Sequence, residues 1–213
     1  MPNQAEEKNL KKRALKIVTT LKKIYPRERV FLNFKTPLEL LIAVILSAQC
    51  TDKKVNEVTE KLFKKYKTLN AYLNADKTEF ENDIRPTGFY KTKAKHILAT
   101  VKLIKSQFRG CVPNTMEELL TLKGVGRKTA NIVLESAYGI IVGIPVDTHV
   151  RRLARIWGLT KESNPVKIEK DLMELIPRKE WAGLSYRIIA YGREHCPSKK
   201  HQHKECPISK IAV

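Results

Sequence analysis

The sequence predicts an all-α protein, and three observations carry that prediction. Capping-box signals, in which a threonine is followed three residues later by a glutamate, occur at Thr36–Glu39 and Thr115–Glu118. Apolar residues recur with the 3.6-residue period of a helix through much of the chain. The one segment rich in β-branched residues, Gly139–Val146, is isolated and contains Pro145, so we interpret it as an extended connector and not as a strand.

The first helices of the chain follow from local start and stop signals. Pro37 stands at the first helical position, where its missing N–H costs nothing, and the apolar run LELLIAVIL follows. After SAQC, Thr51 or Asp52 can cap a second helix with one apolar face. Short helices are expected around 69–73 and over 79–84, and a proline two residues later ends the latter.

A long amphipathic helix comes next. Its apolar stripe covers 94–108, and Gly110 ends it. The Thr115 capping box then opens a helix that runs into the stretch LKGVGRKTANIVL, where another helix begins. After the connector, three more helices are expected over 148–157, 165–175 and 181–191. The tail from Arg193 is basic, rich in histidine and poor in apolar residues.

The charge balance indicates a polyanionic partner. Forty-one lysines and arginines stand against 22 aspartates and glutamates in 213 residues, a formal net charge of +19. Each phosphate that such a chain neutralises releases a condensed counterion, which favours binding of DNA or RNA. General basicity of the source proteome is the alternative explanation.

The sequence also predicts a cellular setting. The longest apolar run, Leu40–Leu46, is far shorter than the ~20 residues of a membrane helix. The charged start lacks the apolar core of a secretory signal. Four cysteines form no dense disulfide framework in a chain of this length. We therefore expect a reducing, cytoplasmic location, and nothing suggests more than a monomer.

Two helices joined by Leu122–Gly126 form a helix-hairpin-helix candidate. Glycines allow positive φ angles and close approach of a backbone. The amides of Gly124, Val125, Gly126 and Arg127 would then lie at a helix N-terminus, where N–H groups favour an anion such as a DNA phosphate. The alternative is a tight turn without a ligand. A phosphate-loop NTPase is excluded, because an arginine intrudes before the lysine and a helix precedes the loop.

Lys128 follows this hairpin and is a candidate nucleophile. An amine in this place can form a Schiff base, and it needs a nearby carboxylate to move protons or to stabilise a developing cation. Asp147, 19 residues later at the start of a helix, is a candidate for that carboxylate. Asp147 could equally be an ordinary N-cap, the commonest role of an aspartate in such a position.

At this point the residues resemble a known family. LKGVGRKTANIVL followed by PVDTHVRRL closely resembles the helix-hairpin-helix and catalytic aspartate of the endonuclease III family of DNA glycosylases. The resemblance extends through TPLELLIAVILSAQCTDKKVN, TGFYKTKAKHI and IIAYGREHC. It covers about residues 28–206, and several separate segments match in the right order.

The resemblance implies a fold of two helical domains with a DNA-binding cleft between them. One domain is expected over 30–138, with six helices and the hairpin at about 115–138. The other is expected to combine 1–29 with 139–213. The partner implied is double-stranded DNA that contains damaged bases or abasic sites.

The resemblance also implies roles for single residues. Lys128 matches the lysine that attacks C1′ of the damaged nucleotide, and Asp147 matches the carboxylate that assists. Gln49 matches a residue that fills the gap left by the extruded nucleotide. Phe89 stands where the family often has a leucine wedge. His149 could contact phosphate, with capping or packing as an equal alternative.

The activity implied is that of a bifunctional glycosylase and abasic-site lyase, which removes oxidised pyrimidines and nicks DNA by β-elimination. Extrusion of the nucleotide is expected, because its sugar and base are out of reach in a stacked duplex. Two alternatives stay open: a monofunctional mismatch glycosylase, which Lys128 disfavours, and a DNA-binding protein without catalysis.

Many members of the family carry a [4Fe–4S] cluster on the spacing C-x6-C-x2-C-x5-C. Counted from Cys196, that spacing falls on His203, Cys206 and Ala212, so two of the four thiolates are missing. We therefore expect no cluster and no metal. Zinc on Cys196, His201, His203 and Cys206 is an alternative, but the spacing C-x4-H-x-H-x2-C matches none of the common structural zinc patterns.

Overall fold

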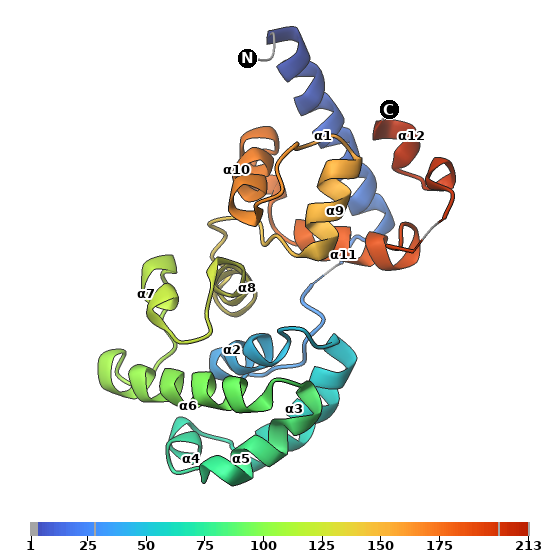
Figure 1. The fold of residues 1–213 in the computed structure, drawn as a ribbon. Helices are drawn as coiled ribbons and strands as arrows, with labels where there is room; N and C mark the ends of the chain where they lie inside the picture. Colours follow the sequence, from blue (N-terminus) through green and yellow to red (C-terminus); the bar gives the residue numbers. More distant parts are fainter. Residues whose placement is uncertain (1–3, 28, 200, 213) are drawn as a thin grey trace. The chain divides into compact units, whose positions relative to one another are not determined.

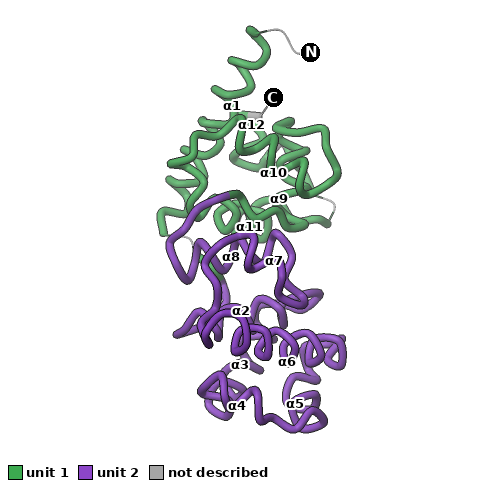
Figure 2. Tube along the Cα trace, turned by 90° about the vertical axis from the view of Figure 1, so that its left-hand side faces the viewer, with its two compact units in different colours: residues 1–30, 143–213 green, residues 31–142 purple. Residues whose placement is uncertain are grey.

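A computed structural model describes residues 4–27, 29–199 and 201–212. All regular structure in these ranges is helical, which confirms the all-α prediction (Figure 1). Among the described residues, no helix combines the length and the apolar character that a membrane span requires. The chain forms two compact units, one of residues 31–142 and one of residues 1–30 with 143–213 (Figure 2).

The unit of residues 31–142 holds α2 to α8 and one 3₁₀ turn, η1. Their bounds are α2 Pro37–Leu46, α3 Asp52–Lys65, α4 Leu69–Leu73, α5 Lys77–Ile84, η1 Arg85–Thr87, α6 Tyr90–Gln107, α7 Met116–Thr121 and α8 Arg127–Tyr138. The predicted caps form: the hydroxyl oxygens of Thr36, Thr51 and Thr115 accept the amides that open α2, α3 and α7.

The centre of this unit is α2. Every residue from Leu40 to Leu46 is buried, because α3, α6 and α8 all pack against this one helix (Figure 1). Burial on all sides explains why the sequence here is a continuous apolar run and not a stripe. The helix that carries Lys128 is therefore held directly against the core of its unit.

The second unit joins the N-terminal helix to the last part of the chain. Its elements are α1 Gln4–Ile24, α9 Thr148–Ile156, α10 Pro165–Leu175, η2 Arg178–Glu180, α11 Leu184–Glu194, η3 His203–Glu205 and α12 Ser209–Ala212. α1 packs against α10, α11 and α12, and α9 packs against α11. Trp157 and Tyr191 meet edge to face in the core, with ring centroids 5.6 Å apart.

Two features of this unit differ from the sequence expectation. α11 begins at Leu184 and not at Trp181, because Gly183 adopts a left-handed conformation with φ +66° that interrupts the helix. Trp181 instead packs in the preceding turn and donates its indole N–H to the Ile176 carbonyl at 2.8 Å. The tail is also more ordered than its composition suggests, since it buries Cys206 and Ile208.

Candidate active site and nucleic-acid interface

The hairpin between α7 and α8 is built by packing and by backbone geometry. Leu122 and Val125 are buried, and the Thr100 hydroxyl of α6 donates to the Lys123 carbonyl at 2.9 Å. Gly124 has φ +77°, and a Cβ there would lie 2.8 Å from Nδ1 of His96. A glycine at this position is therefore required by both conformation and space.

Gly126 differs from Gly124 in both respects. Its φ of −102° suits any residue, and a Cβ on it would meet nothing within 4 Å. Gly126 is the N-cap of α8 and has no side chain to occupy the first-turn amides. The chain itself does not need glycine here, so the open backbone suits the close approach of an external group. The Val125 amide, in contrast, donates to the Leu122 carbonyl at 3.3 Å and shapes the turn.

Lys128 lies in the first turn of α8, directly after this open backbone. Its side chain is exposed, whereas the helix behind it is fixed by Ala130, Val133 and Leu134, each fully buried. An exposed amine on a rigid helix can be presented to a ligand with little loss of conformational freedom in the backbone. Arg127 precedes it and adds a positive charge at the same helix end.

Asp147 caps α9, as one of the two sequence interpretations expects. Its Oδ1 accepts the Val150 amide at 2.8 Å. The connector before it is pinned by Ser185 of α11, whose hydroxyl donates to the Pro145 carbonyl at 2.6 Å. Among the described residues, Oδ2 takes part in no hydrogen bond, so the cap leaves one carboxylate oxygen available. Capping and catalysis are thus compatible roles for one side chain.

Lys128 and Asp147 belong to different compact units. The structure fixes the surroundings of each within its own unit: the hairpin and α8 around the amine, and the pinned connector and α9 around the carboxylate. Each residue is therefore held by packing or capping within its own unit.

Gln49 lies in the turn between α2 and α3 with an uncommon backbone conformation. Its φ is +52° and its side chain is exposed. The Cys50 amide closes the turn by donating to the Ser47 carbonyl at 3.1 Å. Non-glycine residues with positive φ are uncommon and often accompany functional sites.

Phe89 shows the same conformation at the start of α6. Its φ is +48°, and the preceding Gly88 has φ +71°. The Phe89 side chain is 63% exposed, unusual for a large apolar group on a rigid helix end. The two residues for which the sequence predicts a gap-filling role thus share left-handed backbone and exposure.

Lys93 connects these two turns and was missed by the sequence analysis. Its Nζ donates to the Leu46 carbonyl at 2.8 Å and to the Thr87 carbonyl at 2.7 Å. Leu46 lies three residues before Gln49, and Thr87 two residues before Phe89. The Lys93 side chain is 4% exposed, and burial lowers its pKa. A lysine four residues before Ile97, in line with the apolar stripe of the predicted helix, was the signal that could have revealed it.

A basic depression lies along α9. It has a volume of about 1020 Å³, and its lining includes His149, Arg151, Arg152, Arg155 and Lys161. α9 and α11 lie so close together at Gly192 that a Cβ on this glycine would be 2.6 Å from Nδ1 of His149. His149 is thus both packed against α11 and part of the basic lining, so the structure is compatible with both roles considered for it.

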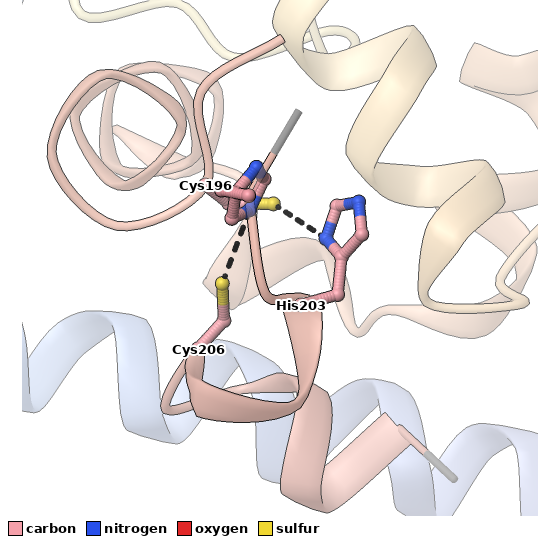
Figure 3. A group of neighbouring side chains, drawn as sticks. Cys196, His203 and Cys206 are labelled. Atoms are coloured by element: carbon pink, nitrogen blue, oxygen red, sulfur yellow. Dashed lines mark hydrogen bonds between the residues drawn. The ribbon is translucent and has the colours of Figure 1, made fainter. Parts of the chain in front are cut away.

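After α11, four potential metal ligands converge. The ligand atoms of Cys196, His201, His203 and Cys206 all lie within 4.8 Å of one another. In Figure 3 the Cys196 thiol points at the His203 ring, 3.5 Å from Nδ1. Sγ of Cys206 lies 3.4 Å from Nε2 of His201. The sequence expectation of a metal-free tail thus meets an arrangement of side chains that could bind a metal.

Comparison with known proteins identifies the family to which this fold and its hairpin belong. Residues 42–178 match the model of the HhH-GPD superfamily of base excision DNA repair proteins. An endonuclease III from Synechocystis sp. is 49% identical over 201 residues, which are 94% of this chain and 92% of that protein. The chain belongs to the endonuclease III family.

Two solved structures of endonuclease III support this membership. One is a non-covalent complex with DNA, 40% identical, with a TM-score of 0.90 and 94% of each chain covered. The other is a trapped covalent intermediate with DNA, 40% identical, with a TM-score of 0.89 and 93% of each chain covered. The protein is a base-excision repair enzyme that combines DNA N-glycosylase and abasic-site lyase activities.

The [4Fe–4S] cluster carried by many endonuclease III proteins does not fit the residues of this chain. Such a cluster takes four cysteine thiolates. Here the fourth position is Ala212, which has no ligand atom, and the second is His203. The other two cysteines, Cys50 and Cys111, belong to the other compact unit. The donor set near Cys196 is two thiols and two imidazoles, a different coordination chemistry.

Proposed function

We propose that Lys128 is the nucleophile of this glycosylase and lyase. Its Nζ attacks C1′ of the damaged nucleotide as the bond to the base breaks, and the base leaves with a proton. The C1′–Nζ adduct opens to a Schiff base, and loss of a C2′ proton then expels the 3′ phosphate by β-elimination. A neutral amine, a sugar and a proton acceptor suffice for these steps.

Asp147 is the proposed carboxylate partner. The Oδ1 bond to the Val150 amide fixes the orientation of the carboxylate, while Oδ2 can accept a proton from the attacking amine or stabilise positive charge on the sugar. The covalent intermediate trapped for a similar endonuclease III supports a covalent route for this chain.

DNA binding is proposed to involve phosphate contacts from both units. In one unit, the open backbone at Gly126 can receive a phosphate through first-turn amides of α8. In the other, Arg151, Arg155 and Lys161 around the basic depression can neutralise a DNA strand. Contacts of both kinds are independent of base sequence, as an enzyme that searches a genome for damage requires.

Gln49 and Phe89 are proposed to stabilise the extruded state of the nucleotide. Extrusion leaves a gap in the base stack, and an exposed polar and an exposed aromatic side chain on fixed turns can occupy it. Both turns belong to the compact unit that carries Lys128, so gap filling and nucleophile share one rigid support.

We further propose that the substrates are oxidised pyrimidines and abasic sites. The reaction on them needs no iron–sulfur cluster, and it takes place in the cytoplasm on nucleoid DNA. The support is the resemblance to endonuclease III together with an amine and a carboxylate as the reacting groups. The single observation that carries the proposal is the place of Lys128: an exposed amine in the first turn of a helix with a buried apolar face, two residues after the open backbone of Gly126.

Borohydride trapping tests the nucleophile. Wild type should form a covalent adduct with a duplex that contains an abasic site, and Lys128→Ala should form none. Lys123→Ala is the matched control, because Lys123 is an exposed lysine of the same hairpin and should leave trapping intact. Trapping by a folded Lys128→Ala protein would assign the chemistry to another amine.

Asp147→Asn tests the carboxylate. Asparagine caps a helix about as well as aspartate, so α9 keeps its N-terminal bond while the charge is lost. Base excision should fall by about 10²–10⁴, the range typical of a lost acid–base group, with DNA binding retained. Excision at the wild-type rate would reduce Asp147 to a cap.

A further inference from the structure

The convergence of Cys196, His201, His203 and Cys206 is a feature that the repair reaction does not use. The four side chains come from a short segment that folds back beside α11, and η3 carries His203. Both thiols are buried, with Cys196 0% and Cys206 3% exposed. Figure 3 shows the two thiols and the His203 ring directed into one small space.

The distances in this group match a single tetrahedral metal ion. With Zn–S bonds of about 2.3 Å and Zn–N bonds of about 2.0–2.1 Å, neighbouring sulfur and nitrogen ligands of a tetrahedral zinc ion lie about 3.5–3.6 Å apart. The two sulfur–nitrogen distances here are 3.5 Å, from Cys196 to His203, and 3.4 Å, from Cys206 to His201. Two ligand pairs therefore already lie at the spacing that a tetrahedral ion requires, and the remaining pairs, all within 4.8 Å, need only to contract around it.

Pairwise hydrogen bonds explain these contacts only in part. Two separate thiol–imidazole pairs account for the two distances, but they do not require that all four ligand atoms lie within 4.8 Å of one another. The ring centroids of His201 and His203 are only 4.2 Å apart. A shared ligand at the centre explains the convergence of both pairs.

The surroundings of the group are those of ligand side chains. Nδ1 of His201 lies 2.9 Å from the Lys199 carbonyl, so this nitrogen can donate to the carbonyl while Nε2 faces the group. Histidines that bind metals typically make such a bond with the nitrogen that is not a ligand. Nη1 of Arg152 lies 3.7 Å from Sγ of Cys196 and Nη2 donates to the Cys196 carbonyl at 2.6 Å, so a positive charge faces a ligand that binds as a thiolate.

We propose that Cys196, His201, His203 and Cys206 bind one zinc ion that fixes the C-terminal segment onto its unit. Zinc displaces the two thiol protons to solvent, including the proton that Cys206 shares with the His195 carbonyl at 3.0 Å, and the two thiolates balance the charge of the ion. The imidazoles bind as neutral ligands. The group takes zinc and not a [4Fe–4S] cluster, because it offers two thiolates and not four.

The segment has a structural need for such a tie. η3 and α12 have only three and four residues, too short to be stable in isolation. Ile208, which lies between them, is nevertheless buried and donates its amide N–H to the Tyr191 hydroxyl at 3.0 Å, and α12 packs against α1. A metal that joins Cys196 to Cys206 holds this short chain in place where apolar burial is small.

Metal analysis of the full-length protein tests the proposal. Protein expressed with both zinc and iron present should contain one zinc atom per chain, little iron and no brown absorbance. Cobalt substituted for zinc should give the visible spectrum of a tetrahedral site with thiolate ligands. A chelator should lower the thermal midpoint, and added zinc should restore it. A metal-free native protein, or one with stoichiometric iron, would overturn the proposal.

Variants locate the site. Loss of a group that only supports a metal ligand typically weakens metal binding about 10- to 100-fold. His201→Ala and Cys206→Ser should each weaken zinc binding by more than this, because each removes a ligand. The matched controls are His195→Ala and Cys111→Ser, which remove an exposed imidazole and an exposed thiol outside the group and should keep one zinc per chain. Full zinc content in Cys196→Ser/Cys206→Ser would overturn the assignment. If the single variants do not fold, the metal content and cobalt spectrum of the wild type still decide.

Discussion

Replacement of Lys93 by methionine should weaken recognition of damaged DNA, although Lys93 is buried. Methionine keeps the length and apolar stem of the side chain but cannot donate to the Leu46 and Thr87 carbonyls. Each of these bonds comes from a charged donor, at 2.8 and 2.7 Å, and such bonds contribute about 1.5–3 kcal/mol. The loss is partly offset because a buried ammonium group no longer has to be desolvated.

The consequence for function follows from the two turns that Lys93 joins. The left-handed conformations of Gln49 and Phe89 each cost about 1–3 kcal/mol and persist only where surrounding bonds hold them. If about 1.4 kcal/mol of this strain is no longer held, the population of the binding-competent turn falls about tenfold. The apparent dissociation constant for the lesion rises by the same factor.

Binding to two duplexes measures this effect. One duplex contains a non-cleavable abasic-site analogue, and the other is undamaged. For Lys93→Met, we expect affinity for the first to fall about tenfold and affinity for the second to stay unchanged, because phosphate contacts dominate binding to undamaged DNA. Lys102→Met is the matched control, since Lys102 is an exposed lysine of the same helix.

The reasoning would be refuted by wild-type affinity for the abasic-site duplex in a folded Lys93→Met protein. An equal loss in Lys102→Met would also refute it, because the loss of one positive charge would then explain the result. Thermal unfolding of each variant separates a local change in the turns from general destabilisation.

Two further predictions concern the glycine hairpin and the titration of Lys93. A left-handed alanine costs about 1–2 kcal/mol, and Gly124→Ala should destabilise the protein by at least this amount, because the added Cβ also meets His96. Gly126→Ala should change stability less and should mainly weaken DNA binding. Denaturant unfolding and DNA titration measure both effects, and wild-type DNA binding by Gly126→Ala would contradict the open-backbone interpretation. Burial lowers the pKa of Lys93 in the folded state below the ordinary value of 10.5, which the unfolded chain keeps. At pH values between the folded-state pKa and 10.5, the unfolded chain therefore binds more protons, and the contribution of Lys93 to stability rises with pH. The unfolding free energy of wild type should therefore rise relative to that of Lys93→Met as the pH is raised toward 10.5. A difference in unfolding free energy that does not change with pH would show that the pKa of Lys93 is not lowered.

Much of the fold was predictable because helix starts are local. Thr36, Thr115 and Pro165 begin their helices where the sequence places them, since the cap and its amide lie within a few residues. The start of α11 was misplaced by three residues, because the left-handed turn at Gly183 depends on how Trp181 packs. The catalytic roles of Lys128 and Asp147 remain predictions. The exposed position of the Lys128 amine and the available oxygen of the Asp147 carboxylate are compatible with these roles.

The strained turns and their tie could not be predicted in the same way. Nothing adjacent to Gln49 or Phe89 in the sequence requires positive φ at a non-glycine residue. The bonds that join the two turns come from Lys93, which lies 47 residues after Leu46. Only the packing of α6 against α2 brings that amine to the end of α2.

By itself, the sequence determined the all-α class, the helix caps, the hairpin, the family and the incomplete four-cysteine motif, because these depend on residue type and short spacing. The tertiary structure alone decided which carbonyls Lys93 bonds, which hairpin glycine the chain itself requires and whether the tail can bind a metal. The spacing C-x4-H-x-H-x2-C matches no common zinc pattern, yet the four ligand atoms meet. They meet because the tail folds back on α11 and α1, and such long-range contacts are not encoded in spacing.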